Sequence, residues 1–273
     1  MNEVAPYGTF APTGLARWII ERTRGFSEGW SSRRVALIMR RFALQALGGA
    51  PVDAAALGAR MRLMPYDNIC DRRLLFTPQF FDAIERRILE ERLTPSFVFI
   101  DVGANIGAYS LFVAARAGPG ARIFAVEPQP RIFDRLSANI RFNPFGTVKA
   151  VACAVVDKAG ELTMFLDARN AGESSVKIVG SGEAATIRVP ATTLLDLARD
   201  EGLERIDAVK LDVEGAEDLI LSAFLRDAPE SLFPSLLIIE RSDGWQSNVP
   251  DLLEANGYRL VTRTRLNMVY ERP

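Results

Sequence analysis

Two apolar stretches of the sequence are followed directly by carboxylates. Asp212 and Glu214 come just after residues 208–211, and Glu240 follows residues 236–239. If these stretches are parallel strands, their carboxyl ends meet at one edge of the sheet, where open α/β sheets bind ligands. A carboxylate can accept a proton from a hydroxyl. We therefore expect Asp212 or Glu214 to act as a general base, with Glu240 as a weaker candidate. Asp212 can alternatively cap the helix that follows it.

The composition narrows this chemistry. The chain has 273 residues, no histidine and two cysteines. An imidazole base, a Ser-His dyad and a His-ligated zinc are therefore excluded, and two thiols cannot build a disulfide framework or a thiolate metal cage. We expect a metal-free site. The alternative is Mg²⁺ held by Asp212, Glu214 and Glu240, because hard cations prefer oxygen ligands.

A glycine-bearing turn separates a third apolar stretch from a helix-like one. The stretch at residues 97–100 ends in Asp101, and Gly103, Asn105 and Gly107 follow. Glycines let a backbone approach a ligand closely, and amides at a helix N-terminus offer hydrogen-bond donors. The G-x-x-x-G spacing differs from the G-x-G-x-x-G of dinucleotide-binding turns, which counts against a nicotinamide-dependent dehydrogenase. A tight turn without a ligand is the structural alternative.

An acidic residue also ends the next apolar stretch. Glu127 follows residues 123–126 and stands 24 residues after Gly103. A carboxylate in this place can accept two hydrogen bonds from the hydroxyls of a ribose. The pattern indicates a nucleoside-containing cofactor, with a surface carboxylate at the start of a loop as the alternative.

The elements that must hold these residues alternate from residue 96 onward. Apolar strand-like stretches and helix-like stretches repeat in units of about 30 residues, which is typical of parallel strands with right-handed crossovers. Residues 155–191 break the alternation and suggest a small β insertion, with extended pieces at 162–166, 176–179 and 186–189. The last two predicted strands are only four residues apart, so they form an antiparallel hairpin. We therefore expect an α/β fold with a mostly parallel sheet, its strands at residues 97–100, 123–126, 148–154, 208–211, 236–239, 258–262 and 267–270.

Residues 1–95 are predicted to form a separate helical segment beside a domain of residues 96–273. Thr94-Pro95-Ser96 marks the boundary, because proline disfavours helix in the residue before it. We expect the segment to serve as a lid or a dimerisation element. Its arginines form either a solvated face or a docking surface for an acidic substrate, carrier or partner subunit. Helical spacing of apolar residues is found at 15–20, 35–47 and 80–89, and a short strand is predicted at 60–64.

Charge and hydropathy limit the partners. The 33 basic and 34 acidic residues give a net charge of −1, which argues against a protein built to neutralise nucleic-acid phosphates. No stretch of about 18 apolar residues lacks a charge, so no membrane span is expected. The first residues lack the basic and apolar regions of a signal peptide. The expected location is the cytoplasm.

Taken together, the motifs resemble a known family. Residues 101–107 (DVGANIG), Glu127-Pro128 and residues 210–215 (KLDVEG), in this order and spacing, are similar to the FkbM family of S-adenosylmethionine-dependent methyltransferases. The resemblance covers residues 96 to about 262, and more loosely residues 69–91. It implies the class I methyltransferase fold, which is a Rossmann-like, mostly parallel seven-stranded sheet with an antiparallel last strand.

The resemblance implies how the cofactor would be bound. Gly103, Asn105 and Gly107 would lie beneath the methionine part of S-adenosylmethionine, with Asp101 near its ammonium group. Glu127 would bind the ribose hydroxyls.

It also places residues near the adenine and the reacting methyl group. The chain around Cys153 and Ala154 would lie near the adenine. Asp212 and Glu214 would stand beside the methyl group, so Asp212 is implied both in catalysis and in cofactor binding. Family members commonly have a histidine shortly after the glutamate of the fifth strand, where this chain has arginine and serine at residues 241–242.

The expected function is O-methylation of a hydroxyl on a sugar, polyketide or other secondary metabolite. An NAD(P)-dependent oxidoreductase on a Rossmann sheet and a non-catalytic cofactor-binding protein are the two alternatives. The expected partners are a small-molecule or glycan acceptor and, through the N-terminal segment, a second copy of the chain.

Overall fold

The computed structural model describes residues 5–27, 29–166, 174–175, 185–213, 215–242 and 244–273. Its centre is a seven-stranded sheet in the order β12-β13-β11-β10-β3-β4-β5, in which β13 is antiparallel to both neighbours. This order confirms the predicted class I methyltransferase fold and its closing hairpin. The strands are β3 (Val98–Val102), β4 (Arg122–Val126), β5 (Val148–Val151), β10 (Ala208–Leu211), β11 (Leu236–Glu240), β12 (Arg259–Arg263) and β13 (Asn267–Glu271).

The centre of the sheet is the place where the strand order reverses. β3 and β10 are parallel neighbours; the chain runs from β3 outward to β5 on one side, and from β10 to β11 on the other. In open α/β sheets, the crevice beyond the carboxyl ends of the strands at such a point is where ligands bind. The fold therefore brings the ends of β3, β4, β10 and β11 to one edge.

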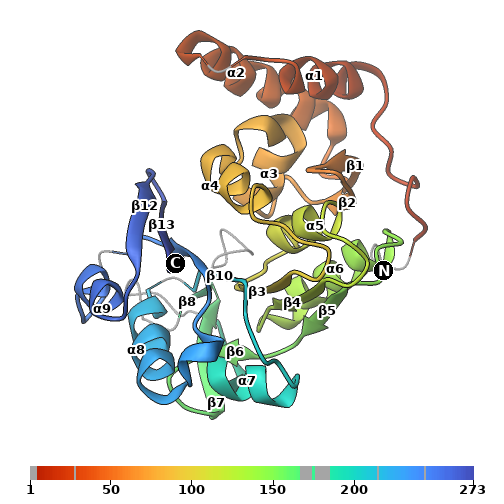
Figure 1. Ribbon diagram of the computed structural model, residues 1–273. Helices are drawn as coiled ribbons and strands as arrows, with labels where there is room; N and C mark the ends of the chain where they lie inside the picture. The colour runs from red at the N-terminus through yellow and green to blue at the C-terminus, as the bar shows by residue number, and fades with distance from the viewer. Residues whose placement is uncertain (1–4, 28, 167–173, 176–184, 214, 243) are drawn as a thin grey trace.

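Helices cover both faces of the sheet (Figure 1). One apolar core includes Phe99 of β3 and residues of α5 (Ala108–Ala114) and α6 (Pro130–Arg141). The other includes Ile100 of β3 and residues of α7 (Leu194–Asp200), α8 (Glu217–Asp227) and α9 (Val249–Ala255). Every residue of β3 and β10 is buried, as expected for strands that are covered on both faces.

The N-terminal segment packs into the first of these cores. Leu74 and Phe76 belong to the same apolar cluster as Phe99 and Leu111 of the sheet domain. The division at residue 95 stays a prediction, since this core is continuous across it. The segment comprises α1 (Gly14–Arg24), α2 (Trp30–Leu47), β1 (Val52–Ala56), β2 (Ala59–Leu63), α3 (Ile69–Phe76), the 3-10 turn η1 (Pro78–Phe80) and α4 (Ala83–Glu90).

Two features of this segment differ from expectation. The strand predicted at 60–64 is β2, but it pairs with β1, which is rich in alanine and has little intrinsic strand preference. Arg62 and Asp53 form a buried ion pair across this hairpin, with Nε and Oδ1 2.7 Å apart. The helix predicted over 80–89 begins only at Ala83, after η1, and α3 precedes it without having been predicted.

A second, four-stranded sheet forms the β insertion, in the order β6-β9-β7-β8. It confirms the predicted insertion, although the strand expected over 148–154 is divided. β5 ends at Val151, and β6 belongs to the second sheet. The extended piece predicted at 176–179 lies outside the described residues. The strands are β6 (Ala154–Val155), β7 (Gly160–Leu166), β8 (Ser174–Ser175) and β9 (Ala185–Thr192).

Helices α1 and α2 lie at the outer edge of the molecule (Figure 1). Large apolar side chains on them are exposed, among them Trp18, Ile38 and Phe42. The proposed roles of this segment as a lid or in a homodimer stay predictions. In the part of the chain that the structure describes, no helix combines the length and apolar character needed to cross a membrane.

Candidate active site

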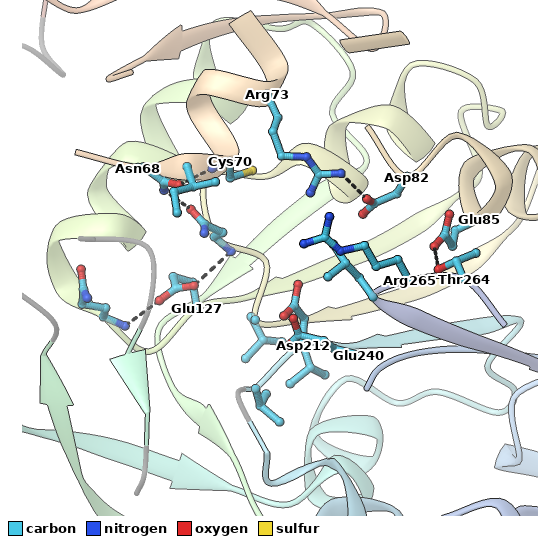
Figure 2. Close-up of a pocket in the computed structure, with 18 of the residues that line it drawn as sticks. Asn68, Cys70, Arg73, Asp82, Glu85, Glu127, Asp212, Glu240, Thr264 and Arg265 are labelled. Carbon is cyan, nitrogen blue, oxygen red and sulfur yellow. Dashed lines mark hydrogen bonds and ion pairs between the residues drawn. The ribbon is translucent and has the colours of Figure 1, made fainter. Parts of the chain in front are cut away.

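A cavity of about 1080 Å³ opens at the carboxyl ends of the central strands. Glu127, Asp212 and Glu240, which end β4, β10 and β11, all line it (Figure 2). The N-terminal segment and the β12–β13 turn form one wall, and the β insertion contributes another. The structure therefore brings together three of the described carboxylates that the sequence analysis placed on this edge. Glu214, also expected here, lies outside the described residues.

The turn after β3 passes unusually close to β10. Gly103, Asn105 and Gly107 all have a left-handed backbone, with φ of 75°, 51° and 95°. A Cβ on Gly103 would lie 1.9 Å from the carbonyl oxygen of Asp212, so only glycine fits there. Gly103 and Asn105 line the cavity, but Gly107 is not among the described lining residues. Gly107 instead starts α5 against Leu136, whose Cδ1 would lie 2.8 Å from an added Cβ.

Glu127 is held at the end of β4 by the backbone around it. Its Oε2 accepts a hydrogen bond from the Asn105 amide at 3.0 Å, and its Oε1 accepts one from the Gln129 amide at 2.9 Å. The residue is only 8% exposed, and burial raises the pKa of its carboxyl to about 7. Glu127 is thus oriented by two amides while its carboxyl still faces the cavity.

Three charged residues are linked behind the cavity. Asp101 is buried, and its Oδ2 accepts hydrogen bonds from the amide and the hydroxyl of Ser110. Its Oδ1 has no hydrogen-bond partner and lies 4.0 Å from Nζ of Lys210. Asp101 borders a smaller adjoining cavity of about 110 Å³, not the main one. Burial raises the pKa of this carboxyl above its ordinary value.

Lys210 connects Asp101 to Asp212. Its Nζ donates a hydrogen bond to Oδ2 of Asp212 at 2.7 Å. Burial alone would lower the pKa of Lys210, but Asp212 and Asp101 raise it above its usual value. Burial would likewise raise the pKa of Asp212, yet Lys210 and a side-chain hydrogen bond with Glu240 hold it below the ordinary value. These contacts favour the ionised form of Asp212, which can accept a proton.

The alternative of a Mg²⁺ site receives no support. In the described ranges, no group of three or more His, Cys, Asp or Glu side chains could hold a metal ion. Asp212 and Glu240 are neighbours, but the ammonium of Lys210 already supplies a positive charge to Asp212.

The other end of the cavity is apolar. Cys153 and Ala154 line it, 8% and 5% exposed, and so does the buried Met164 of the β insertion. Burial raises the pKa of the Cys153 thiol to about 11, so it stays protonated and acts as an apolar side chain. Cys153, Ala154 and Met164 therefore give this part of the cavity an apolar lining.

Several lining residues come from the N-terminal segment and were missed by the sequence analysis. Oδ1 of Asn68 caps α3 by accepting from the Cys70 amide, and its Nδ2 donates to Oδ1 of Asn105 at 2.9 Å. Arg73 donates to Oδ1 of Asp82 at 2.7 Å. The looser resemblance over residues 69–91 was the signal for Arg73 and Asp82, whereas Asn68 lies just before that range.

A further contact joins the N-terminal segment to the β12–β13 turn. Oε1 of Glu85 accepts from the Thr264 hydroxyl at 2.6 Å and from Nδ2 of Asn267 at 2.9 Å. Glu85 is 3% exposed. This contact places the turn, including Arg265, at the cavity (Figure 2).

The strand order and the cavity at its reversal define a class I methyltransferase. Residues 101–260, more than half of the chain, match the family model described as the methyltransferase FkbM domain. The chain therefore belongs to the FkbM methyltransferase family. This confirms the expectation of an S-adenosylmethionine-dependent methyltransferase and favours it over an NAD(P)-dependent oxidoreductase.

Two sequence relatives agree with this assignment. The chain is 33% identical over 201 residues to methyltransferase sdnD of Sordaria araneosa, covering 63% of this chain and 77% of that protein. It is 29% identical over 201 residues to the 31-O-demethyl-FK506 methyltransferase FkbM of Streptomyces tacrolimicus, covering 62% and 75%. Among solved structures, fibrillarin of Aeropyrum pernix in complex with S-adenosyl-L-methionine matches at 14% identity and a TM-score of 0.42, covering 69% and 74%.

Proposed function

We propose that this protein transfers the methyl group of S-adenosylmethionine to a hydroxyl of a small-molecule or glycan acceptor. The observation that carries the proposal is the shared cavity of Glu127 and Asp212, with the glycine turn of β3 between them. The Streptomyces relative is named a 31-O-demethyl-FK506 methyltransferase, which supports oxygen as the methylated atom.

The residues present fit the cofactor. Glu127 would accept hydrogen bonds from the ribose hydroxyls, and the walls at Cys153, Ala154 and Met164 would enclose the adenine. Oδ1 of buried Asp101, which accepts no hydrogen bond from the described residues, would attract the ammonium of the methionine part from the adjoining cavity. Gly103 and Asn105 would lie beneath that part.

The catalytic contribution of the chain is mainly positioning. When bound, S-adenosylmethionine supplies an electrophilic methyl group on a positively charged sulfur. Holding the acceptor hydroxyl in line with that carbon contributes roughly several kcal/mol. Negatively charged side chains beside the sulfur would stabilise the bound cofactor more than the transition state. The reason is that the positive charge on the sulfur disperses as the methyl group leaves.

Asp212 is proposed as the base that takes the hydroxyl proton. Its contacts favour the ionised form, it lines the cavity, and Lys210 fixes its carboxylate from behind. A positioned base typically contributes about 10²-fold or more to the rate. Glu214 stays a candidate for the same role on the sequence, and Glu240 a weaker one.

A binding measurement tests the cofactor assignment. Calorimetric titration should show S-adenosylmethionine and S-adenosylhomocysteine binding, with NAD as a control that does not bind. Incubation with hydroxyl-bearing glycosides and macrolides should then yield an O-methyl ether visible by NMR. Tight binding of NAD, or no binding of either sulfur compound, would refute the proposal.

A further inference from the structure

Four arginines line the part of the cavity that faces the N-terminal segment and the β12–β13 turn. They are Arg40 of α2, Arg73 of α3, Arg87 of α4 and Arg265 of the turn. We name this set the arginine rim. Figure 2 shows the guanidinium groups of Arg73 and Arg265 pointing into the cavity. The carboxylates of Glu127, Asp212 and Glu240 instead end the central strands, so the two kinds of charge occupy different walls.

Among the described residues, Arg73 is the one member of the rim that forms an ion pair. Arg73 binds Asp82. Within the described part of the chain, Arg40, Arg87 and Arg265 form no side-chain hydrogen bond or ion pair.

The carboxylates that border the same cavity are already occupied. Asp82 accepts from Arg73 and from the Tyr109 hydroxyl. Glu85 accepts from Thr264 and Asn267. On this wall the four arginines exceed the two carboxylates Asp82 and Glu85 by two charges, while Glu127, Asp212 and Glu240 line the cavity at the strand ends.

Arg40 is a partly buried cation that lies near a second guanidinium group. It is partly buried, and burial together with the nearby Arg72 lowers the pKa of its guanidinium. Nε of Arg72 is also buried without a hydrogen-bond partner. Two neighbouring guanidinium groups without a carboxylate are costly in a half-buried place unless a ligand supplies the negative charge.

We propose that Arg40 and Arg265 bind an anionic group, a carboxylate or a phosphate, on the acceptor. The inference rests on the proposed function and specifies its substrate class. Guanidinium groups bind such oxyanions through paired N–H donors. With the anion at the arginine rim, the rest of the acceptor would extend toward Asp212, where its hydroxyl would meet the methyl group.

Small anions test the site without knowledge of the acceptor. Protein saturated with S-adenosylhomocysteine would be titrated with phenyl phosphate, phenylacetate and, as a neutral probe, benzyl alcohol. We expect at least one anion to bind about tenfold or more tightly than benzyl alcohol, with an affinity that falls as NaCl rises. The preferred anion distinguishes a phosphate-bearing from a carboxylate-bearing acceptor.

Substitutions of Arg40 and Arg265 test whether these two residues bind the anion. Arg40→Gln and Arg265→Gln should each weaken anion binding by about tenfold, as expected for loss of a charge-assisted contact. Arg41→Gln and Arg263→Gln are the matched controls, because both arginines are exposed neighbours that do not line the cavity. These controls should bind the anion like the wild type.

Two results would overturn the inference. One is wild-type protein that binds neither anion better than benzyl alcohol; the other is equal anion binding by the wild type and by the Arg40 and Arg265 variants. S-adenosylhomocysteine affinity should be unchanged in all four variants. Failure of the wild type to bind S-adenosylhomocysteine would instead refute the proposed function, so the two failures are distinguishable.

Discussion

Glu127 gives the cavity a pH dependence that can be measured. Burial raises the pKa of its carboxyl to about 7, above the ordinary value of 4.5, while the ionised form is the better acceptor for two ribose hydroxyls. We predict that the Kd of S-adenosylhomocysteine rises as the pH falls from 8 to 5.5. Glu127→Gln should bind more weakly at pH 8, by about tenfold, and should lose most of this dependence. Calorimetry at several pH values checks both; a wild-type Kd that is constant over this range would contradict the assignment.

The carboxyl of Glu127 also makes the stability of the fold depend on pH. A higher pH favours cofactor binding but lowers the stability of the unliganded protein. Because its folded-state pKa is raised, Glu127 stabilises the fold fully below its unfolded pKa of 4.5, and this contribution is lost as the pH rises through about 7. As the pH rises from 4.5 to 8, the free energy of unfolding of the unliganded wild type should therefore fall relative to that of Glu127→Gln, as urea unfolding at several pH values would show.

Asp212 is the residue whose loss should separate catalysis from binding. Asp212→Asn keeps the shape of the side chain but removes the proton acceptor, so kcat should fall by about 10²-fold or more. The affinity for S-adenosylhomocysteine should change far less. Single-turnover kinetics and calorimetry measure the two effects, and full turnover in the variant would exclude Asp212 as the base.

At the scale of elements, the contact between the turn after β3 and the end of β10 is the most constrained feature. An alanine at position 103 would adopt a φ of 75° and place its Cβ 1.9 Å from the carbonyl oxygen of Asp212. Gly146→Ala is the matched control, because its φ is 70° but nothing lies within 4 Å.

We predict that Gly146→Ala lowers the free energy of unfolding by about 1–2 kcal/mol, the strain of a left-handed residue. Gly103→Ala should cost at least about 2 kcal/mol more, because the backbone must also move, and it should weaken cofactor binding. Urea unfolding of both variants gives the comparison. Equal losses would show that the close approach is relaxed in solution.

At the scale of the whole molecule, the N-terminal segment and the sheet domain are joined by a shared core. Leu74, Leu75 and Phe76 of α3 are almost completely buried and belong to the cluster that contains Phe99. Asn68 and Glu85 add polar contacts to Asn105 and to the β12–β13 turn. The segment therefore completes both the core and the cavity wall.

We predict that a chain truncated before Leu93 loses its cooperative unfolding transition and binds hydrophobic dyes, because the core face under α3 becomes exposed. Circular dichroism, dye binding and gel filtration test this outcome. A truncated chain that folds and keeps its acceptor specificity would show that residues 1–92 are dispensable for both.

The sequence predicted the sheet and its ligand-binding edge because those signals are local. Strand-like stretches that alternate with helices indicate parallel strands, and residues at their carboxyl ends then share one edge whatever the loops do. Glu127 and Asp212 could therefore be assigned to one crevice, and the short link before Asn267 required a hairpin. Strand β1, which pairs with the predicted strand β2, and helix α3 were not predicted, because an alanine-rich strand and a short helix give weak periodicity.

What the sequence alone determined was the fold class, the FkbM family and the carboxylates at the strand ends. Only the tertiary structure decided their electrostatic surroundings and the acceptor wall. Lys210 lies between Asp101 and Asp212, and Asn68 reaches Asn105 from a segment 37 positions away. Such contacts depend on how separate elements pack. No local residue pattern encodes them, because the hydrogen-bonding and charge preferences of a side chain do not specify its distant partner.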